Sequence, residues 1–189
     1  METGTFLTQI LPVRNQDLRR ILERECRVDD FRKGEMVSEP GKTGRYVRFL
    51  ISGIVKEFIV DREGKETTTA FLIHSGDIIA DAAILDGGIS EIGFRAITDS
   101  KISSLPVKTI LEQRERYPEV MEHQALLLER LADCRWKTER MLYLKTARER
   151  YEWFLEKYPG LIDQVPHSDI ASYLNMTPVT LSRIRHNRE

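Results

Sequence analysis

The sequence changes character near residue 107, and this change limits the folds open to the chain. From about residue 27 to residue 106, short runs of β-branched and aromatic residues alternate with glycines spaced as strand ends require. This pattern is typical of an antiparallel sandwich or barrel. After residue 107 the apolar residues recur at helical spacing. We therefore predict an α+β chain in which an antiparallel β domain, preceded by one or two short helices within residues 5–25, is followed by helices.

A hairpin is the clearest feature of the predicted β domain. The turn at residues 61–65 contains Gly64 and joins two β-rich runs, which is a typical hairpin signal. The predicted strands are Tyr46–Ile51, Ile54–Val60, Glu66–Ile73, Phe94–Thr98 and Lys101–Val107.

The helical part begins with Lys108–Arg116 and continues in one long helix, Glu119–Tyr143. This long helix carries two apolar lines, which suggests that it packs on its own domain and also on the same helix of a second copy. A helix buried within a monomer remains the alternative. The first line, to which we assign the dimer contact, is Val120, Leu127, Leu131, Cys134 and Met141. The second line is Met121, Ala125, Leu128, Ala132 and Leu142.

The last part of the chain predicts a compact helical unit. Thr146–Lys157 is a predicted helix, and residues 166–188 form two shorter ones. Asn175 lies at the break, where it tolerates the left-handed conformation. Thr177 and Pro178 supply a hydroxyl cap and a first helical residue. This is the pattern of a helix-turn-helix, whose second helix enters the DNA major groove. An ordinary helical hairpin with a solvated basic face is the alternative.

Composition narrows the class of protein. The chain has 189 residues, 41% of them hydrophobic and 31% charged, with a net charge of −1. These values are ordinary for a soluble globular protein, so nucleic-acid binding would need a local basic patch. No apolar run is long enough to span a bilayer, and residues 1–13 lack the features of a signal peptide. We therefore expect a cytoplasmic protein without a membrane partner.

The sequence contains no residue pattern typical of a metal site or a catalytic site. Cys26 and Cys134 are too few for a four-thiolate iron–sulfur site, and we expect both to be buried or half-buried free thiols. The four histidines are scattered, with none of the spacings used for zinc or iron. A cupin-like enzyme would need a histidine-rich motif, and His74 alone is available in the β domain. We expect no metal, no cofactor and no catalytic residues.

The order of these parts resembles the Crp/Fnr family of bacterial transcription regulators over nearly the whole chain. The stretches that carry the resemblance are Phe31–Glu35, Leu50–Lys56, Gly76–Ile78 and Ile170–Arg185. The last of these is similar to a subgroup common in Bacteroidetes-type bacteria. The resemblance implies a jelly-roll of the cyclic-nucleotide-binding type in residues 1–117, a long dimerisation helix in 118–145 and a helix-turn-helix domain in 146–189. It also implies a homodimer on double-stranded DNA, with a small-molecule effector and RNA polymerase as further partners.

The resemblance also assigns roles within the second short helix. It implies that Arg183 reaches a guanine edge, since arginine pairs bidentately with the O6 and N7 atoms. Val179 stands where many relatives have glutamate, which favours contact with a thymine methyl group. Thr180 and Arg185 are expected to contact phosphates. The full predicted set of DNA-binding residues is Thr177, Val179, Thr180, Ser182, Arg183 and Arg185.

The effector region departs from the family pattern. Ser90 and Glu91 stand where nucleotide-binding members have arginine followed by serine or threonine. A carboxylate repels an anionic phosphate, and the bidentate cation is missing. We therefore predict that the roll does not bind cyclic AMP or cyclic GMP in the usual manner, although Arg95 could swing in. The residues assigned to the effector pocket are Asp77, Asp81, Ser90, Glu91 and Arg95.

One further departure lies after the second short helix. Relatives often continue into a two-stranded wing that adds phosphate contacts, and no wing is expected within the last residues of this sequence. Fewer phosphate contacts would weaken binding and flatten its salt dependence. An effector-sensing or interaction module with weak or no DNA binding is therefore the alternative function.

Overall fold

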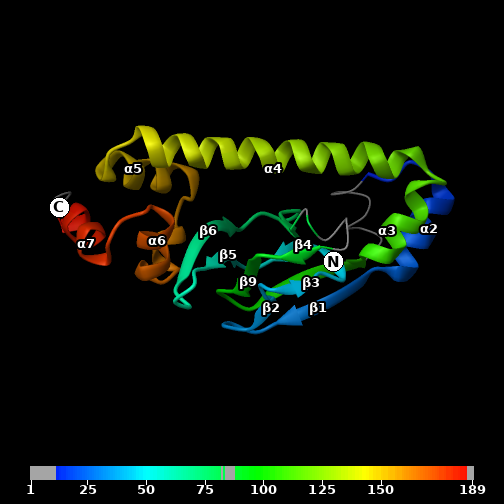
Figure 1. The fold of residues 1–189 in the computed structure, drawn as a ribbon, viewed down its shortest axis with the longest axis horizontal. Helices are drawn as coiled ribbons and strands as arrows, with labels where there is room; N and C mark the ends of the chain where they lie inside the picture. The colour runs from blue at the N-terminus through cyan, green and yellow to red at the C-terminus, as the bar shows by residue number, and fades with distance from the viewer. Residues whose placement is uncertain (1–11, 82, 84–87, 187–189) are drawn as a thin grey trace.

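The computed structural model describes residues 12–81, 83 and 88–186. A β-roll occupies the middle of the molecule, and one long helix, α4 (Pro118–Leu144), runs above it along the length of the molecule (Figure 1). Two helices, α2 (Gln16–Glu25) and α3 (Val107–Arg114), lie at one end. The C-terminal helices lie at the other end, so α4 connects two groups of helices across the roll.

The roll consists of short antiparallel strands, as the sequence predicts. Two sheets have four strands each, in the orders β1-β10-β4-β7 and β2-β9-β5-β6, and β3 pairs with β8. The predicted hairpin is confirmed as the pairing of β5 with β6. The strands are β1 (Arg27–Phe31), β2 (Met36–Ser38), β3 (Lys42–Thr43), β4 (Tyr46–Ser52), β5 (Val55–Val60), β6 (Glu66–Leu72), β7 (Ile78–Ile79), β8 (Ile89–Ser90), β9 (Ile92–Ala96) and β10 (Ser100–Pro106).

Strand β4 shows why the roll carries helices on its outer surface. Val47 and Phe49 pack in a cluster with α2, α3 and α4, whereas Leu50 packs in the interior of the roll with Val55 and Phe94. Successive side chains of a strand point to opposite faces. Because Val47, Phe49 and Ile51 make the outer face of β4 apolar, this face requires a helical cover.

The C-terminal helices are α5 (Ala147–Lys157), α6 (His167–Tyr173) and α7 (Pro178–His186), with the short 3-10 helix η2 (Leu161–Asp163) between α5 and α6. We call residues 146–186 the head. Thr146 and Glu149 form a reciprocal capping box, which explains why α5 begins directly after Thr146. The predicted helix limits agree with these bounds to within two residues.

The expected domain limits, before residues 118 and 146, coincide with the start of α4 and with the residue that caps α5. The buried core, however, extends across these limits. One apolar cluster contains Ile54, Phe71 and Ile97 of the roll, Met141 of α4, and residues from all three α-helices of the head. The head is therefore packed against the roll and α4 as part of a continuous core, in an antiparallel roll, long helix and helical head arrangement of the α+β class.

Candidate nucleic-acid interface

Helices α6 and α7 form the predicted helix-turn-helix. Asn175 adopts a positive φ of 49° at the break between them. The Thr177 hydroxyl oxygen accepts a hydrogen bond from the backbone N–H of Thr180 at 3.1 Å, and Pro178 is the first residue of α7. These three predictions are confirmed. Pro166, expected as the first helical residue, is instead the residue before α6, because the helix begins at His167.

Close packing between α6 and α7 fixes which side of α7 faces outward. Ala171, Leu174 and Leu181 are almost completely buried between the two helices and α5. The small side chain of Ala171 permits a close approach, and the backbone N–H of Met176 donates to its carbonyl oxygen at 2.9 Å. The burial of Leu181 leaves the opposite side of α7 in contact with solvent.

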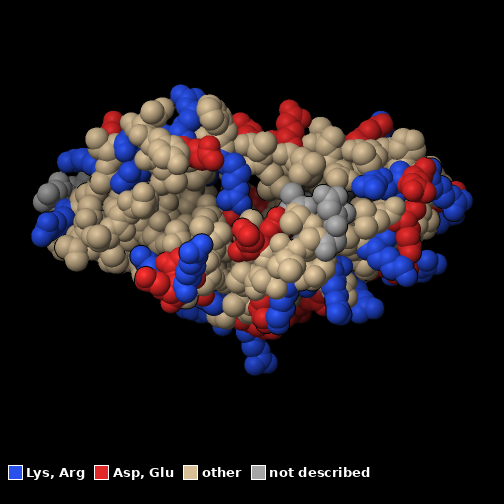
Figure 2. Space-filling model, in the orientation of Figure 1, with Lys and Arg blue, Asp and Glu red and all other residues tan. Residues whose placement is uncertain are grey.

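The predicted DNA-contacting residues lie on that outward side. Val179 is 60% exposed, and Ser182 and Arg183 are exposed next to it. Thr180 is half-buried, and its hydroxyl lies 2.9 Å from that of Thr177. Within the described part of the chain, Arg183 has no acidic partner. Helix α7 forms one tip of the molecule, away from the roll, and basic side chains are visible at this tip (Figures 1 and 2).

Arg185 is placed differently from Arg183. It is half-buried, and its Nη1 atom lies 2.6 Å from Nε2 of His167 at the start of α6. The predicted phosphate contact would therefore be made beside the N-terminus of α6, where backbone N–H groups favour anions. The structure brings Arg185 and His167 together although they are 18 residues apart in sequence.

Buried ion pairs dock α6 on the β5–β6 hairpin. Lys56 of β5 has a side chain only 6% exposed, and its Nζ atom lies 2.9 Å from Asp169 of α6 and 3.2 Å from Glu66 of β6. Arg95 donates to both oxygens of Glu66 at 2.8 and 2.7 Å. Burial alone would raise the pKa of Glu66, but the hydrogen bonds from Arg95 and Lys56 outweigh it, and this pKa lies below its ordinary value.

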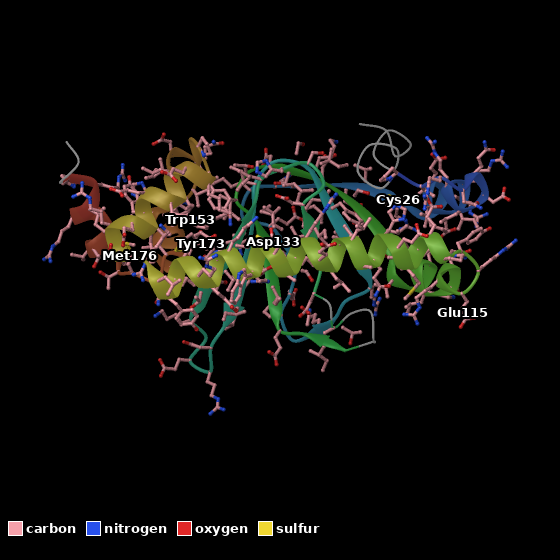
Figure 3. All side chains as sticks on the ribbon, turned by 90° about the horizontal axis from the view of Figure 1, so that it is seen from above. Cys26, Glu115, Asp133, Trp153, Tyr173 and Met176 are labelled. Atoms are coloured by element: carbon pink, nitrogen blue, oxygen red, sulfur yellow. The ribbon has the colours of Figure 1, made fainter. Side chains whose placement is uncertain are left out.

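An aromatic cluster completes the docking of the head. Phe71 of β6 meets the rings of Phe154, Tyr158 and Tyr173 at centroid separations of 6.1, 6.1 and 5.3 Å. The rings of Trp153 and Tyr173 lie 6.3 Å apart, and Figure 3 labels both at the head end of the molecule. Burial raises the pKa of Tyr158, so its hydroxyl stays protonated and serves as a hydrogen-bonding group. The cluster fixes the orientation of the head relative to the roll.

The sequence did not reveal these docking residues. Lys56 and Glu57 stand together in a strand of otherwise apolar residues, and this interruption was the available signal. Charged residues are rarely buried unless they are paired. Glu57 is 5% exposed, accepts a hydrogen bond from Thr69 at 2.5 Å, and pairs with Arg135 of α4 at the same distance.

The two apolar lines of α4 are placed in opposite surroundings. Val120, Leu127 and Leu131 are half-buried and face the roll, and Met141 is 1% exposed in the shared core. These four residues of the predicted dimer line therefore contact the chain's own body, because α4 covers the outer face of the sheet. Cys134, also assigned to that line, is exposed, so its expected burial is wrong, whereas Cys26 is buried as expected.

The second line of α4 faces solvent instead. Its members Met121, Ala125, Leu128 and Ala132 are all exposed, and they follow one another at intervals of four, three and four residues. Such spacing is that of a coiled-coil seam. These four residues therefore form an apolar line on α4 that is exposed to solvent, whereas Leu142, the fifth member of the line, is half-buried.

The five residues assigned to the effector pocket do not form one group. The Ser90 hydroxyl donates to Asp81 at 3.0 Å, so these two are together. Asp77 accepts from the backbone N–H groups of Ile73 and His74 and closes a turn, Glu91 is exposed, and Arg95 is engaged by Glu66. The remaining part of this region, residues 82 and 84–87, lies outside the described residues.

Among the residues that the structure describes, no group of three or more His, Cys, Asp or Glu side chains is arranged to hold a metal ion. Likewise, no helix in the described ranges is long and apolar enough to cross a membrane.

Comparison with known proteins agrees with this architecture. Residues 28–117 match the family model of the cyclic nucleotide-binding domain. The regulatory protein HlyX of Actinobacillus pleuropneumoniae is 26% identical over 183 residues, which cover 88% of this chain and 72% of that protein.

Two solved structures share the fold. FixK2 from Bradyrhizobium japonicum superimposes with a TM-score of 0.75 at 19% identity, covering 86% of this chain and 83% of that chain. The catabolite activator protein of Thermus thermophilus has a TM-score of 0.55 at 22% identity, covering 96% and 85%.

The roll matches a cyclic nucleotide-binding domain, and the order of roll, long helix and helical head is the fold of these solved structures. The chain therefore shares the fold of these proteins, and its relative and its matching domain agree with the resemblance to the Crp/Fnr family found in the sequence.

Proposed function

We propose that the chain acts in the cytoplasm as a homodimer that binds double-stranded DNA through α7 and thereby regulates transcription. The observation that carries this proposal is the outward face of α7. Val179, Ser182 and Arg183 are exposed at one tip of the molecule, on a helix held by the burial of Leu181. This is the arrangement in which a recognition helix enters the major groove.

The exposed line of α4 supports the dimer. Pairing of Met121, Ala125, Leu128 and Ala132 with the same residues of a second copy would remove an apolar stripe from water. A twofold pair of heads suits DNA half-sites about 34 Å apart, one helical turn. The dimer would thus present two copies of α7 to one face of the duplex.

The DNA contact is tested by selecting bound fragments from sheared genomic DNA with the purified protein. Arg183→Ala is expected to lose roughly 1–3 kcal/mol at its base pair and to relax the selected sequence there. Arg148→Ala, which alters an exposed arginine of α5, is the control and should select the unaltered sequence. Equal enrichment by wild type and Arg183→Ala would rule out the role of Arg183, and failure to enrich any fragment at low salt would favour the interaction-module alternative.

The dimer contact is tested by light scattering coupled to gel filtration. Leu128→Glu places a charge within the exposed line and is expected to give monomers. Leu126→Glu changes a leucine of similar exposure, 53% against 41%, that lies off the line, and this variant should remain dimeric. If the two variants behave alike, the dimer does not form through this line.

We also propose that the roll responds to something other than a cyclic nucleotide. Asp81 accepts a hydrogen bond from Ser90, and the neighbouring Glu91 is exposed. Both carboxylates oppose an anionic phosphate at Ser90. Calorimetric titration with cyclic AMP should show no micromolar binding, and micromolar binding would overturn this part of the proposal.

A further inference from the structure

A small cavity lies between the N-terminal half of α4 and the outer face of the roll. Its volume is about 100 Å³. Its walls come from α2, α3, α4 and strands β4, β7 and β10, and they are apolar almost throughout; Leu18, Phe49, Leu105, Val120 and Leu127 are representative. Leu128 lines the cavity and is also 41% exposed, so the cavity communicates with the surface beside α4.

One polar atom in this wall has no partner. The side-chain oxygen of Gln124, on α4, is buried without a hydrogen bond from any residue that the structure describes. A buried acceptor left unpaired costs free energy, so such groups are uncommon in native proteins. The oxygen belongs to a residue that lines the cavity, and a ligand in the cavity is a natural source of the missing donor.

The other polar side chains at the cavity, Asp81 and His123, each have a hydrogen-bonding partner elsewhere in the chain. The oxygens of Asp81 accept from the backbone of Ala83 and from Ser90. The Nδ1 atom of His123 lies 2.8 Å from the carbonyl oxygen of Glu119. A water molecule in this space would find few partners, whereas buried waters make about three hydrogen bonds. The lining therefore favours an apolar occupant over water.

The size of the cavity restricts the occupant further. Drug-sized ligands occupy pockets of about 300–1,000 Å³, so a cavity of about 100 Å³ is too small for a nucleotide. An apolar cavity of about 150 Å³ in another protein stays dry and takes up benzene. A molecule of about five to seven non-hydrogen atoms fits this range.

We propose that this cavity binds a small apolar molecule that carries a single hydrogen-bond donor, of the class of short alcohols and phenols, with its hydroxyl group on the Gln124 oxygen. Strand β7 and α4 each contribute to the wall, and α4 continues without a break to the head. Asp81 borders the cavity, so the site adjoins the Asp81–Ser90 contact, but most of its walls come from the helices outside the roll.

Phenol and toluene test this proposal as a matched pair, because toluene replaces the hydroxyl group with a methyl group of similar size. Binding is measured by calorimetry and by NMR shifts of the full-length protein, without DNA, so that this proposal and the proposed function can fail separately. Phenol is expected to bind one molecule per chain, and roughly two- to tenfold more tightly than toluene, as one net hydrogen bond allows. The largest shifts should fall on Val120, Gln124 and Leu127.

Two variants sharpen the test. Gln124→Leu removes the acceptor and leaves a shorter apolar side chain, so it should abolish or reverse the preference for phenol while toluene still binds. Ala80→Leu fills the cavity and should exclude both molecules. Glu129→Gln, an exposed change on the same helix, is the control and should bind like wild type. Absence of saturable binding, shifts confined to other parts of the molecule, or an unchanged preference in Gln124→Leu would each overturn the proposal.

Discussion

The two ends of α4 are packed in different ways. At its C-terminal end Met141 is 1% exposed and belongs to a core shared with the roll and the head. At its N-terminal end the half-buried Val120 and Leu127 border a cavity, and the firm attachments are polar: Glu119 accepts hydrogen bonds from the backbone N–H groups of Arg14 and Asn15. One helix thus joins a closely packed end to an end with room for a small molecule.

This contrast suggests where a signal could enter and where it would be delivered. A closely packed core transmits a displacement, since its side chains have few alternative positions. The contact beside the cavity can take up a ligand without first displacing a side chain. The N-terminal half of α4 is therefore the more adjustable end, and the head is fixed to the other end.

The largest expected effect separates the two ends by stability. Phe154→Ala removes a completely buried ring from the shared core and should lower the free energy of unfolding by about 3–5 kcal/mol. Leu127→Ala removes a half-buried side chain beside an existing cavity and should cost less, about 1–2 kcal/mol. Urea denaturation measures both values. Similar losses for the two variants would remove the distinction between the ends.

The next effect concerns the ion pairs that dock the head. Lys56→Met leaves Asp169, whose side chain is 17% exposed, without its partner, which should cost roughly 3 kcal/mol. The double variant Lys56→Met with Asp169→Leu is expected to recover much of this loss, because no unpaired charge remains at that contact. Arg148→Gln, which breaks an exposed pair on α5, is the control and should cost less than about 1 kcal/mol. If Lys56→Met resembles this control, the docking pair does not stabilise the head.

The smallest expected effect is a dependence of the free energy of unfolding on pH. It should arise from Glu119, at the N-terminal end of α4, and from Glu66, where the head is docked. Burial alone would raise the pKa of Glu119, but hydrogen bonds from the backbone of Arg14 and Asn15 and from the Arg14 side chain outweigh it, and the pKa is lowered. The pKa of Glu66, at the docked hairpin, is lowered as well. A carboxylate with a lowered folded pKa stabilises the protein above its unfolded pKa of about 4.3, and this contribution is lost as the pH falls through the folded value.

Two variants separate the contributions of Glu119 and Glu66 to this pH dependence. Glu119→Gln and Glu66→Gln should each flatten the decline in unfolding free energy below about pH 4.3, measured by urea denaturation at a series of pH values. A decline as steep as that of wild type in either variant would mean that the carboxylate in question does not contribute.

The sequence predicted those features that depend on local chemistry. Asn175 and Thr177–Pro178 specify the break and restart between α6 and α7 whatever surrounds them, and the structure confirms both. The β5–β6 hairpin follows equally from its turn and its flanking strands. The two apolar lines of α4 were likewise visible in the sequence as helical spacing.

The features that depend on distant contacts were not predictable in the same way. Spacing alone could not tell which line of α4 faces the roll, because both are apolar; the structure decides this by placing Val120 and Leu127 over the sheet. Arg95 was a candidate for the effector pocket, yet Glu66, on a neighbouring part of the same sheet, engages it. The docking of Lys56 on Asp169 joins residues 113 positions apart, and no local pattern encodes such a pair.

The core shared by the roll, α4 and the head has a consequence for the evolution and engineering of this chain. A DNA-reading unit borrowed from a relative could not simply be grafted behind α4, because its first two helices must match the Phe71 ring and the Lys56 ammonium group on the hairpin. If α7 reads DNA as proposed, exchange of specificity is easiest at its outward residues, at the tip of the molecule, whereas replacement of a whole head requires matched changes in β5 and β6.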